Sequence, residues 1–260
     1  MKLQVAKKRV PKIILHLYRQ YKRKKEIMAF AGTNVVCPIC NATFREFGMQ
    51  GSEKRTNARC LSCGSLERHR LLWKYLYANT SLFNNTQKIK LLHIAPEKCF
   101  YNAFTKHKNI TYLPCDLYPE VYDYHGTVKI SRVDVTNIPF DEGYFDVIIC
   151  NHVLEHVPDD ALAMAELFRV MKTGGWGIFQ VPIDYSRQNT YEDDTIVTTE
   201  GRKKAFGQGD HVRIYGHDYK ERLAHAGFAV TEDDYVNTFT KEQIAKYALL
   251  QSEMIYYCTK

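Results

Sequence analysis

Short apolar runs alternate with helix-like stretches over the last two thirds of the chain. Runs with the length and composition of buried strands lie at residues 89–95, 110–116, 145–150, 175–181, 227–231 and 253–259. Stretches with helical spacing lie at residues 97–107, 159–171 and 217–226. Because strands that alternate with helices favour a mostly parallel sheet, residues 88–260 are predicted to form an α/β domain.

The segments outside this alternation predict three further parts. Residues 1–30 are predicted to form a basic helical arm, and residues 31–83 a cysteine-rich module followed by a connecting helix. Residues 183–215 are polar, aromatic and long for a connection, which is typical of a functional loop. We interpret them as an insertion on the substrate side of the α/β domain.

Positive charge is concentrated in the basic arm. Ten of its 30 residues are Lys or Arg and one is acidic, so the arm carries +9. The whole chain carries +7, and residues 31–260 therefore sum to −2. A cationic helix with an apolar side suits an anionic membrane surface or a nucleic acid. Packing of the helix on the cysteine-rich module and disorder of the arm are the alternatives.

No run of the sequence approaches the ~20 apolar residues that span a bilayer, and the first residues lack the apolar core of a secretory signal. We therefore expect a cytoplasmic protein without a transmembrane segment, peripheral at the membrane if the arm binds lipid. Without export, the eight cysteines favour metal binding and buried thiols over disulfides. Cys115 and Cys150 lie in strand-like runs and fit buried thiols.

Four cysteines form two CxxC pairs that are separated by 19 residues: Cys37, Cys40, Cys60 and Cys63. Two such pairs place four thiolates around one tetrahedral site, and four sulfur ligands leave no open position. The pattern therefore predicts a zinc ribbon with a structural Zn²⁺ ion, with reduced free cysteines or an iron–sulfur cluster as alternatives. Asn41 and Gly64, which follow the two pairs, tolerate the left-handed backbone that such turns often need.

Two segments of the α/β region carry a resemblance, VDVTNIPFDEGYFDVIICNHVLEHV at residues 133–157 and ELFRVMKTGG at residues 166–175. They resemble the class I methyltransferases that use S-adenosyl-L-methionine, especially the methyltransferase type 11 group. The resemblance implies a Rossmann-like, mostly parallel seven-stranded sheet with helices on both faces, and methyl transfer from that cofactor. Together with the CxxC pairs, residues 64–70 and the loop at 93–97 also resemble a zinc-ribbon methyltransferase family of bacteria.

In such a fold the cofactor lies at the carboxyl ends of the strands. The residues that the resemblance places there are His93, Ala95, Glu97, Asp116, Leu117, Asp134, Val135 and Asn151. Asp116 ends the second strand, where a carboxylate accepts hydrogen bonds from both ribose hydroxyls. Asp134 follows the short third strand on the adenine side. Ordinary turn aspartates are the alternative for both.

The first loop departs from the family, because residues 91–98 contain no glycine and His93 stands where an acid is usual. Glycine permits close approach of the backbone, so the methionine end of the cofactor must be held differently. Ala95 is small enough to help, and Glu97 is placed to meet the amino group of the cofactor. A degenerate loop that binds no cofactor is the opposing interpretation.

Two histidines are the candidate general bases. His211 in the insertion is the first candidate, since the pKa of a histidine lies near neutrality, and His152 after the fourth strand is the second. Ordinary surface or packing histidines are the alternative for both. Arg213 is expected to hold an anionic acceptor.

The sequence supports three functions. The first is an S-adenosylmethionine-dependent methyltransferase that acts on a small-molecule or glycan-type acceptor. The second is an RNA or protein methyltransferase that binds its substrate with the ribbon and the arm, although the acidic remainder of the chain weakens the case for this function. The third is a non-catalytic binding module with a methyltransferase fold, which the missing glycines suggest.

Overall fold

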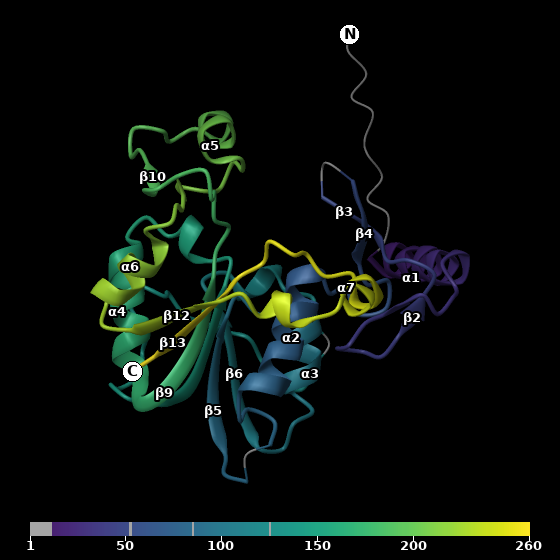
Figure 1. Cartoon of the computed structure of the whole chain (residues 1–260), viewed down its shortest axis with the longest axis horizontal. Helices are drawn as coiled ribbons and strands as arrows, with labels where there is room; N and C mark the ends of the chain where they lie inside the picture. Colours follow the sequence, from purple (N-terminus) through teal and green to yellow (C-terminus); the bar gives the residue numbers. More distant parts are fainter. Residues whose placement is uncertain (1–11, 52–53, 85, 125) are drawn as a thin grey trace.

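The computed structural model describes residues 12–51, 54–84, 86–124 and 126–260 (Figure 1). Residues 1–11, the start of the predicted basic arm, lie outside the described residues. A central sheet is covered by helices on both faces, and the small N-terminal module lies beside one of the two helical layers (Figure 1).

The centre of the fold is a seven-stranded sheet with the order β12-β13-β9-β8-β5-β6-β7. Its strands are β5 (Ile89–Ile94), β6 (Ile110–Asp116), β7 (Ser131–Arg132), β8 (Phe145–Asn151), β9 (Met171–Gln180), β12 (Ala229–Asp233) and β13 (Ile255–Thr259). β13 is antiparallel to both of its neighbours, and the other neighbouring strands are parallel. The predicted mostly parallel sheet of seven strands is thereby confirmed.

Each face of the sheet has its own helical layer, because successive side chains of a strand point to opposite faces. The helices are α2 (Glu67–Asn79), α3 (Lys98–Phe104), α4 (Asp160–Val170), α6 (Tyr219–His225) and α7 (Lys241–Tyr247). Leu92 and Ile148 pack against α4 and α6 on one face. Leu91 and Ile149 pack against α2, α3 and α7 on the other. The predicted helices are present with shorter bounds, whereas α7 had no counterpart among the predictions.

The N-terminal module contains two small antiparallel sheets. Its elements are α1 (Lys12–Ala29), β1 (Val35–Val36), β2 (Thr43–Phe44), β3 (Gly48–Gln50) and β4 (Arg55–Arg59), with β1 paired to β2 and β3 paired to β4. Its buried core is small and consists mainly of Val35, Phe44, Phe47, Leu61 and the cysteines. A core of this size supports little independent stability, so the module depends on the cysteine cluster and on its contacts with the larger domain.

Arg70 of α2 joins the module to the α/β domain. Its guanidinium is completely buried and donates to the carbonyls of Ala58 and Ser65 on one side and of Tyr247 and Ala248 on the other. It also lies 4.2 Å from the ring centroid of Phe47. One side chain therefore satisfies four backbone acceptors from the two parts of the molecule.

The C-terminal half of α1 packs on the N-terminal module, which was one of the alternatives for the arm. Arg23 donates to the carbonyl of Leu61 (3.1 Å), and Glu26 lies 3.3 Å from Arg59. The neighbouring lysines of α1 at positions 22, 24 and 25 are exposed. No helix in the described part of the chain is long and apolar enough to cross a bilayer.

The insertion at residues 183–215 forms a small unit above the carboxyl ends of the strands. It contains β10 (Tyr191–Glu192), α5 (Thr199–Phe206) and β11 (Arg213–Ile214), with β10 and β11 paired. In Figure 1 this unit and the β3–β4 hairpin both rise above the same end of the sheet. Three short 3₁₀ turns complete the fold: η1 (Pro119–Val121), η2 (Leu154–His156) and η3 (Tyr235–Thr238).

Candidate functional site

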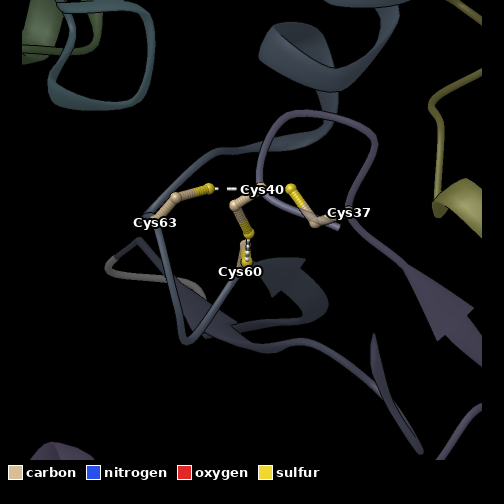
Figure 2. Close-up of side chains that lie close together, drawn as sticks. All are labelled: Cys37, Cys40, Cys60 and Cys63. Atoms are coloured by element: carbon tan, nitrogen blue, oxygen red, sulfur yellow. Dashed lines mark hydrogen bonds between the residues drawn. The ribbon is translucent and has the colours of Figure 1, made fainter. Parts of the chain in front are cut away.

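The four cysteines of the CxxC pairs converge on one point (Figure 2). The sulfur of Cys37 lies 3.6 Å from that of Cys63, and the sulfur of Cys40 lies 3.7 Å from that of Cys60. All four sulfurs are within 4.8 Å of one another. A tetrahedral zinc ion with Zn–S bonds of about 2.3 Å holds its sulfurs about 3.8 Å apart. The donor set and its spacing thus fit a structural zinc ion.

The turns after the two CxxC pairs explain this convergence. Asn41 and Gly64 have φ values of 58° and 79°, so the predicted left-handed conformation is confirmed. Their N–H groups donate to the carbonyls of Cys37 (2.8 Å) and Cys60 (2.9 Å), which closes each turn. Hydrogen bonds from the neighbouring thiols, first that of Cys40, hold the pKa of Cys37 well below its usual range.

The glycine-free loop after β5 keeps a glycine-like backbone. Ala95 has a φ of 49°, in the left-handed region that is unfavourable for a residue with a Cβ atom. Two residues later, the Glu97 carboxylate lines a small cavity together with Arg68, His69 and Asn151. It lies 2.8 Å from Nε2 of His93 and accepts from the amide of Asn151 (3.1 Å). Burial opposes ionisation of Glu97, but the hydrogen bond with His93, the charge of His93 and the weaker effects of His69 and the backbone together lower the pKa of Glu97 to about 2.

His93 is completely buried, and its other ring nitrogen lies 2.9 Å from the hydroxyl of Tyr112. Both of its nitrogens therefore have protein partners. The geometry gives His93 the role of a residue that positions Glu97, rather than one that touches a ligand directly.

Helix α2 contributes two side chains that sequence reasoning missed. His69 accepts at Nδ1 from the N–H of Leu66 (3.0 Å), which places the proton of its neutral ring on Nε2, 3.5 Å from Glu97. Burial lowers the pKa of His69 to about 3, so its ring is neutral near pH 7. Arg68 precedes it and lines the same cavity. The basic residues at 64–70 were a visible signal, but their spacing did not reveal what they face.

The carboxyl end of β8 is also strained. His152, directly after Asn151, has a φ of 54° although it is not glycine. Strain of this kind is concentrated at functional sites. The Nδ1 atom of His152 lies 3.4 Å from Oε1 of Glu155 in η2.

Five buried polar atoms surround this end of the sheet and have no hydrogen-bond partner within the described residues. They are Arg68 Nε, His69 Nε2, Asn151 Oδ1, His152 Nε2 and Glu155 Oε2. An unsatisfied buried polar atom costs free energy and calls for an explanation such as a bound ligand. Because all five atoms belong to residues around adjoining hollows at this end of the sheet, they mark a place that is built for a polar ligand.

The two predicted ribose and adenine acids lie at the neighbouring strand ends. Asp116 ends β6 and accepts from the N–H of Tyr118 and from the hydroxyl of Tyr122, both at 2.7 Å. Asp134, two residues after β7, is exposed and accepts from the N–H and the hydroxyl of Thr136. Beside them Leu117 is exposed and Val135 is buried. A ribose diol would have to share or displace the contact of Tyr122 with Asp116.

Two adjoining hollows, of about 560 and 860 Å³, lie above the strand ends between the insertion and the N-terminal module. They share lining residues that include Arg55, Arg68, Gln208 and His211. The β3–β4 hairpin supplies Arg55, and the insertion supplies Lys203. We call these hollows together the acceptor cavity. Acidic side chains line the hollows as well, namely Glu67, Glu155, Asp184, Asp210 and Glu253, so the acceptor cavity is polar and carries charges of both signs.

His211 lines both hollows, as the sequence predicted for a residue of the insertion. It is buried, and its ring centroid lies 4.7 Å from that of His156. Desolvation lowers the pKa of His211.

Arg213 has a different role from the one expected. It is only 3% exposed, and its three nitrogens donate to Glu192 and to the carbonyls of Leu154, Val157 and Pro158. All of its donor nitrogens are therefore engaged by the protein. Arg213 fastens the insertion to η2 and is not available to an anionic acceptor.

Comparisons with known proteins agree with this geometry. The profile of a family described as "Methyltransferase domain" (Methyltransf_11) matches residues 100–179, which include Asp116, Asp134 and Asn151. A ubiquinone biosynthesis O-methyltransferase of Bordetella pertussis is 36% identical over 61 residues, which is 21% of this chain and 25% of that protein. An uncharacterized methyltransferase of Mycobacterium sp. (strain KMS) is 27% identical over 106 residues, 41% of each chain. The chain thus spans about a quarter of the first of these relatives and under half of the second.

Among solved structures, a chain from the complex of the Haloferax volcanii methyltransferase activator Trm112 superposes with a TM-score of 0.50 at 15% identity. The superposition covers 74% of this chain and 90% of that one, and it supports the fold. The strand order and the matched profile lead to one assignment. The chain carries a methyltransferase domain of the class I, S-adenosylmethionine-dependent family.

Proposed function

We propose that this chain transfers a methyl group from S-adenosyl-L-methionine to a hydroxyl of an anionic small-molecule or glycan-type acceptor. The observation that carries the proposal is the set of five unpartnered buried polar atoms on α2, at the end of β8 and on η2, beside the acceptor cavity. A domain kept only as a scaffold has no reason to retain such atoms, since each one destabilises the fold.

Three of the five unpartnered atoms match the two charged groups at the methionine end of the cofactor. Arg68 Nε and the Nε2–H of His69 are donors, as a carboxylate requires. Asn151 Oδ1 and the neighbouring carboxylate of Glu97 are acceptors, as an ammonium group requires. This set replaces the glycine-rich loop of the family: α2 binds the carboxylate, and the ends of β5 and β8 bind the amino group.

Asp116 and Asp134 would hold the adenosine. Asp116 would accept from the ribose hydroxyls and Asp134 from the adenine amino group, with Leu117 and Val135 beside the base. The support is their position at the carboxyl ends of adjacent parallel strands, where nucleotides bind in open α/β sheets.

The cofactor supplies an electrophilic methyl group. As the acceptor oxygen bonds to the methyl carbon, the carbon–sulfur bond breaks and its electron pair stays on sulfur. The protein aligns the two reactants and removes the proton of the acceptor. His152 is suited to this removal, because its Nε2 is unpartnered and its Nδ1 faces Glu155, which orients the ring. His211 lines the same cavity and is the second candidate base.

The nature of the acceptor follows from the cavity. Lys203 lines it and would meet an anionic group of the acceptor, such as a phosphate or a carboxylate. Arg55 lines it too but already pairs with Glu67 (3.3 Å), and Arg68 is assigned to the cofactor. The likeness to a ubiquinone biosynthesis O-methyltransferase supports oxygen as the methylated atom, although it extends over only 61 residues.

The cysteine cluster would bind a structural zinc ion that holds the β3–β4 hairpin at the rim of the acceptor cavity. The exposed lysines of α1 would attach the protein to an anionic membrane surface or nucleic acid. Neither role takes part in the chemistry.

The test is calorimetric titration of the full chain with S-adenosylmethionine and S-adenosylhomocysteine, followed by incubation with methyl-labelled cofactor and fractionated small molecules. We expect both nucleosides to bind. Asp116→Asn should weaken each by at least tenfold, and Asp141→Asn, at an exposed acid before β8, should not. Absence of binding at millimolar cofactor would show a non-catalytic module. Label in RNA or protein alone would replace the proposed acceptor class with a macromolecule.

A further inference from the structure

We propose that Glu155, His156 and His211 bind a divalent transition-metal ion at the wall of the acceptor cavity, separate from the cysteine cluster. Glu155 and His156 belong to η2, and His211 precedes β11 in the insertion. One ligand atom from each of the three residues lies within 4.8 Å of the others, and all three residues line the cavity.

The donor set and the spacing suit such an ion. A metal with bonds of about 2.1 Å to nitrogen and oxygen holds its ligands roughly 3 to 3.5 Å apart, which side chains whose ligand atoms all lie within 4.8 Å of one another can reach by small rotations. Two imidazoles and a carboxylate leave coordination positions open, as in zinc sites that bind a substrate or water, and they also accept Mn²⁺. Four thiolates, in contrast, form a closed site that favours zinc.

An independent observation points to a missing ligand at this place. Glu155 is only 2% exposed, and its Oε2 atom has no hydrogen-bond partner within the described residues. Its Oε1 atom faces Nδ1 of His152 at 3.4 Å. A buried carboxylate oxygen without a partner is costly, and a bound cation would remove that cost.

The surroundings also orient the ligands. His156 donates from Nδ1 to the carbonyl of Asp210 (3.2 Å), which leaves the lone pair of Nε2 free, and metal-binding histidines commonly make such a bond. The N–H of Val212 donates to the carbonyl of Glu155 (2.9 Å), and Arg213 binds the carbonyls of Leu154 and Pro158. These bonds hold η2 and the segment of His211 together before any ion arrives.

The chemical role of the ion rests on the proposed function. An acceptor hydroxyl bound to the ion would lose its proton more readily, because a cation stabilises the alkoxide. The proton passes to Nε2 of His152. The oxygen then bonds to the methyl carbon, and the electron pair of the broken carbon–sulfur bond stays on sulfur. His211 then acts as a ligand of the metal and His152 as the base.

The test is calorimetric titration of the zinc-loaded full chain with Mn²⁺, with electron paramagnetic resonance as a second measurement of bound manganese. Mn²⁺ is the probe because oxygen and nitrogen ligands accept it and four thiolates do not. We expect one Mn²⁺ per chain. Glu155→Gln, His156→Gln and His211→Gln should each weaken binding at least tenfold. His225→Gln, at an exposed histidine at the end of α6, is the matched control and should leave binding unchanged.

The outcomes separate this site from the proposed function, because the same samples are titrated with S-adenosylmethionine. Cofactor binding without manganese binding would overturn the metal site and leave the methyltransferase in place. Manganese binding that all three variants retain would also overturn it, since the ion would then lie elsewhere. Cofactor affinity that is unchanged in a variant shows that the variant is folded, so its loss of manganese reports on the site.

Discussion

The cysteine cluster and the acceptor cavity are both assemblies of buried polar groups, but they are built from the chain in opposite ways. The cluster takes its four ligands from two turns that are 19 residues apart, and each turn orients its own pair of sulfurs. The acceptor cavity and the small cavity beside it draw on α2, on the ends of β5 and β8, and on the insertion, which only the complete sheet brings together. Local geometry thus builds the first, and tertiary structure builds the second.

The difference extends to stability. The cluster holds together a module whose own core is small, so the ligand stabilises the fold. The cavity rests on a large two-sided core and carries five unpartnered polar atoms, so the fold supports the ligand site. A change in the cluster should therefore act mainly on stability, and a change in the cavity mainly on binding.

The largest expected effect comes from removing one ligand of the cluster. Cys60→Ser should abolish stoichiometric zinc binding and unfold the module, because structural zinc contributes on the order of 10 kcal/mol to folding in such sites. The measurements are zinc content and limited proteolysis of residues 31–64. Cys258→Ala, at a buried thiol in β13, is the control and should keep its zinc. A Cys60→Ser protein that retains zinc and resists protease would contradict the conclusion that the cysteine cluster stabilises its module.

The cysteine cluster was predictable because its signal lies within a few residues. Two CxxC pairs, each followed by a residue that tolerates positive φ, determine both the ligands and the turns. The other strands of the sheet, with Asp116 at the end of β6, were predictable in the same way from apolar runs. β7 consists of Ser131 and Arg132 and forms no apolar run, so Asp134 after it was placed only by the resemblance.

The contents of the cavity were not predictable from local patterns. His69 and Arg68 appeared as charged residues near the start of a helix, and nothing in the spacing showed that they reach Glu97. Arg213 was expected to bind an acceptor, but its role depends on carbonyls more than 50 residues away in the sequence. Such contacts arise from tertiary packing, which single-sequence patterns do not encode.

The second largest effect is expected at Arg70, where the two regions meet. Arg70→Leu removes a donor from four backbone carbonyls, of which only that of Ser65 keeps a printed backbone partner, the N–H of Cys60 (2.8 Å), and should lower the free energy of unfolding by about 3 kcal/mol or more. Urea denaturation measures this change. Arg45→Leu, at an exposed arginine of the same module, should change it by less than about 0.5 kcal/mol. Equal effects of the two substitutions would show that the module and the domain are not joined through Arg70.

An effect on cofactor binding is expected at Glu97. Glu97→Gln keeps the shape of the side chain but removes the charge that would meet the ammonium group of the cofactor. Affinity for S-adenosylmethionine should fall about 10- to 100-fold, which corresponds to the free energy that a hydrogen bond to a charged group contributes. Calorimetry measures it, with Glu200→Gln at the exposed start of α5 as the control. Unchanged affinity would remove Glu97 from the cofactor site.

The smallest effect is a gain in stability at Ala95. Its left-handed backbone is unfavourable with a Cβ atom, so Ala95→Gly should raise the free energy of unfolding by about 0.5–1 kcal/mol, after the entropy that glycine loses on folding. Ala224→Gly, on the exposed side of α6, should lower it by a similar amount. Thermal denaturation compares the two. Destabilisation by Ala95→Gly would show that the methyl group packs usefully in the loop.

The position of the β3–β4 hairpin links the availability of zinc to the choice of the methyl acceptor. Gln50 and Arg55 of that hairpin form part of the wall of the acceptor cavity. A chain starved of zinc would keep its sheet and the two acids at the strand ends, but it would lose that wall. Without zinc, the protein would then bind its acceptor more weakly while it still binds the adenosine of the cofactor.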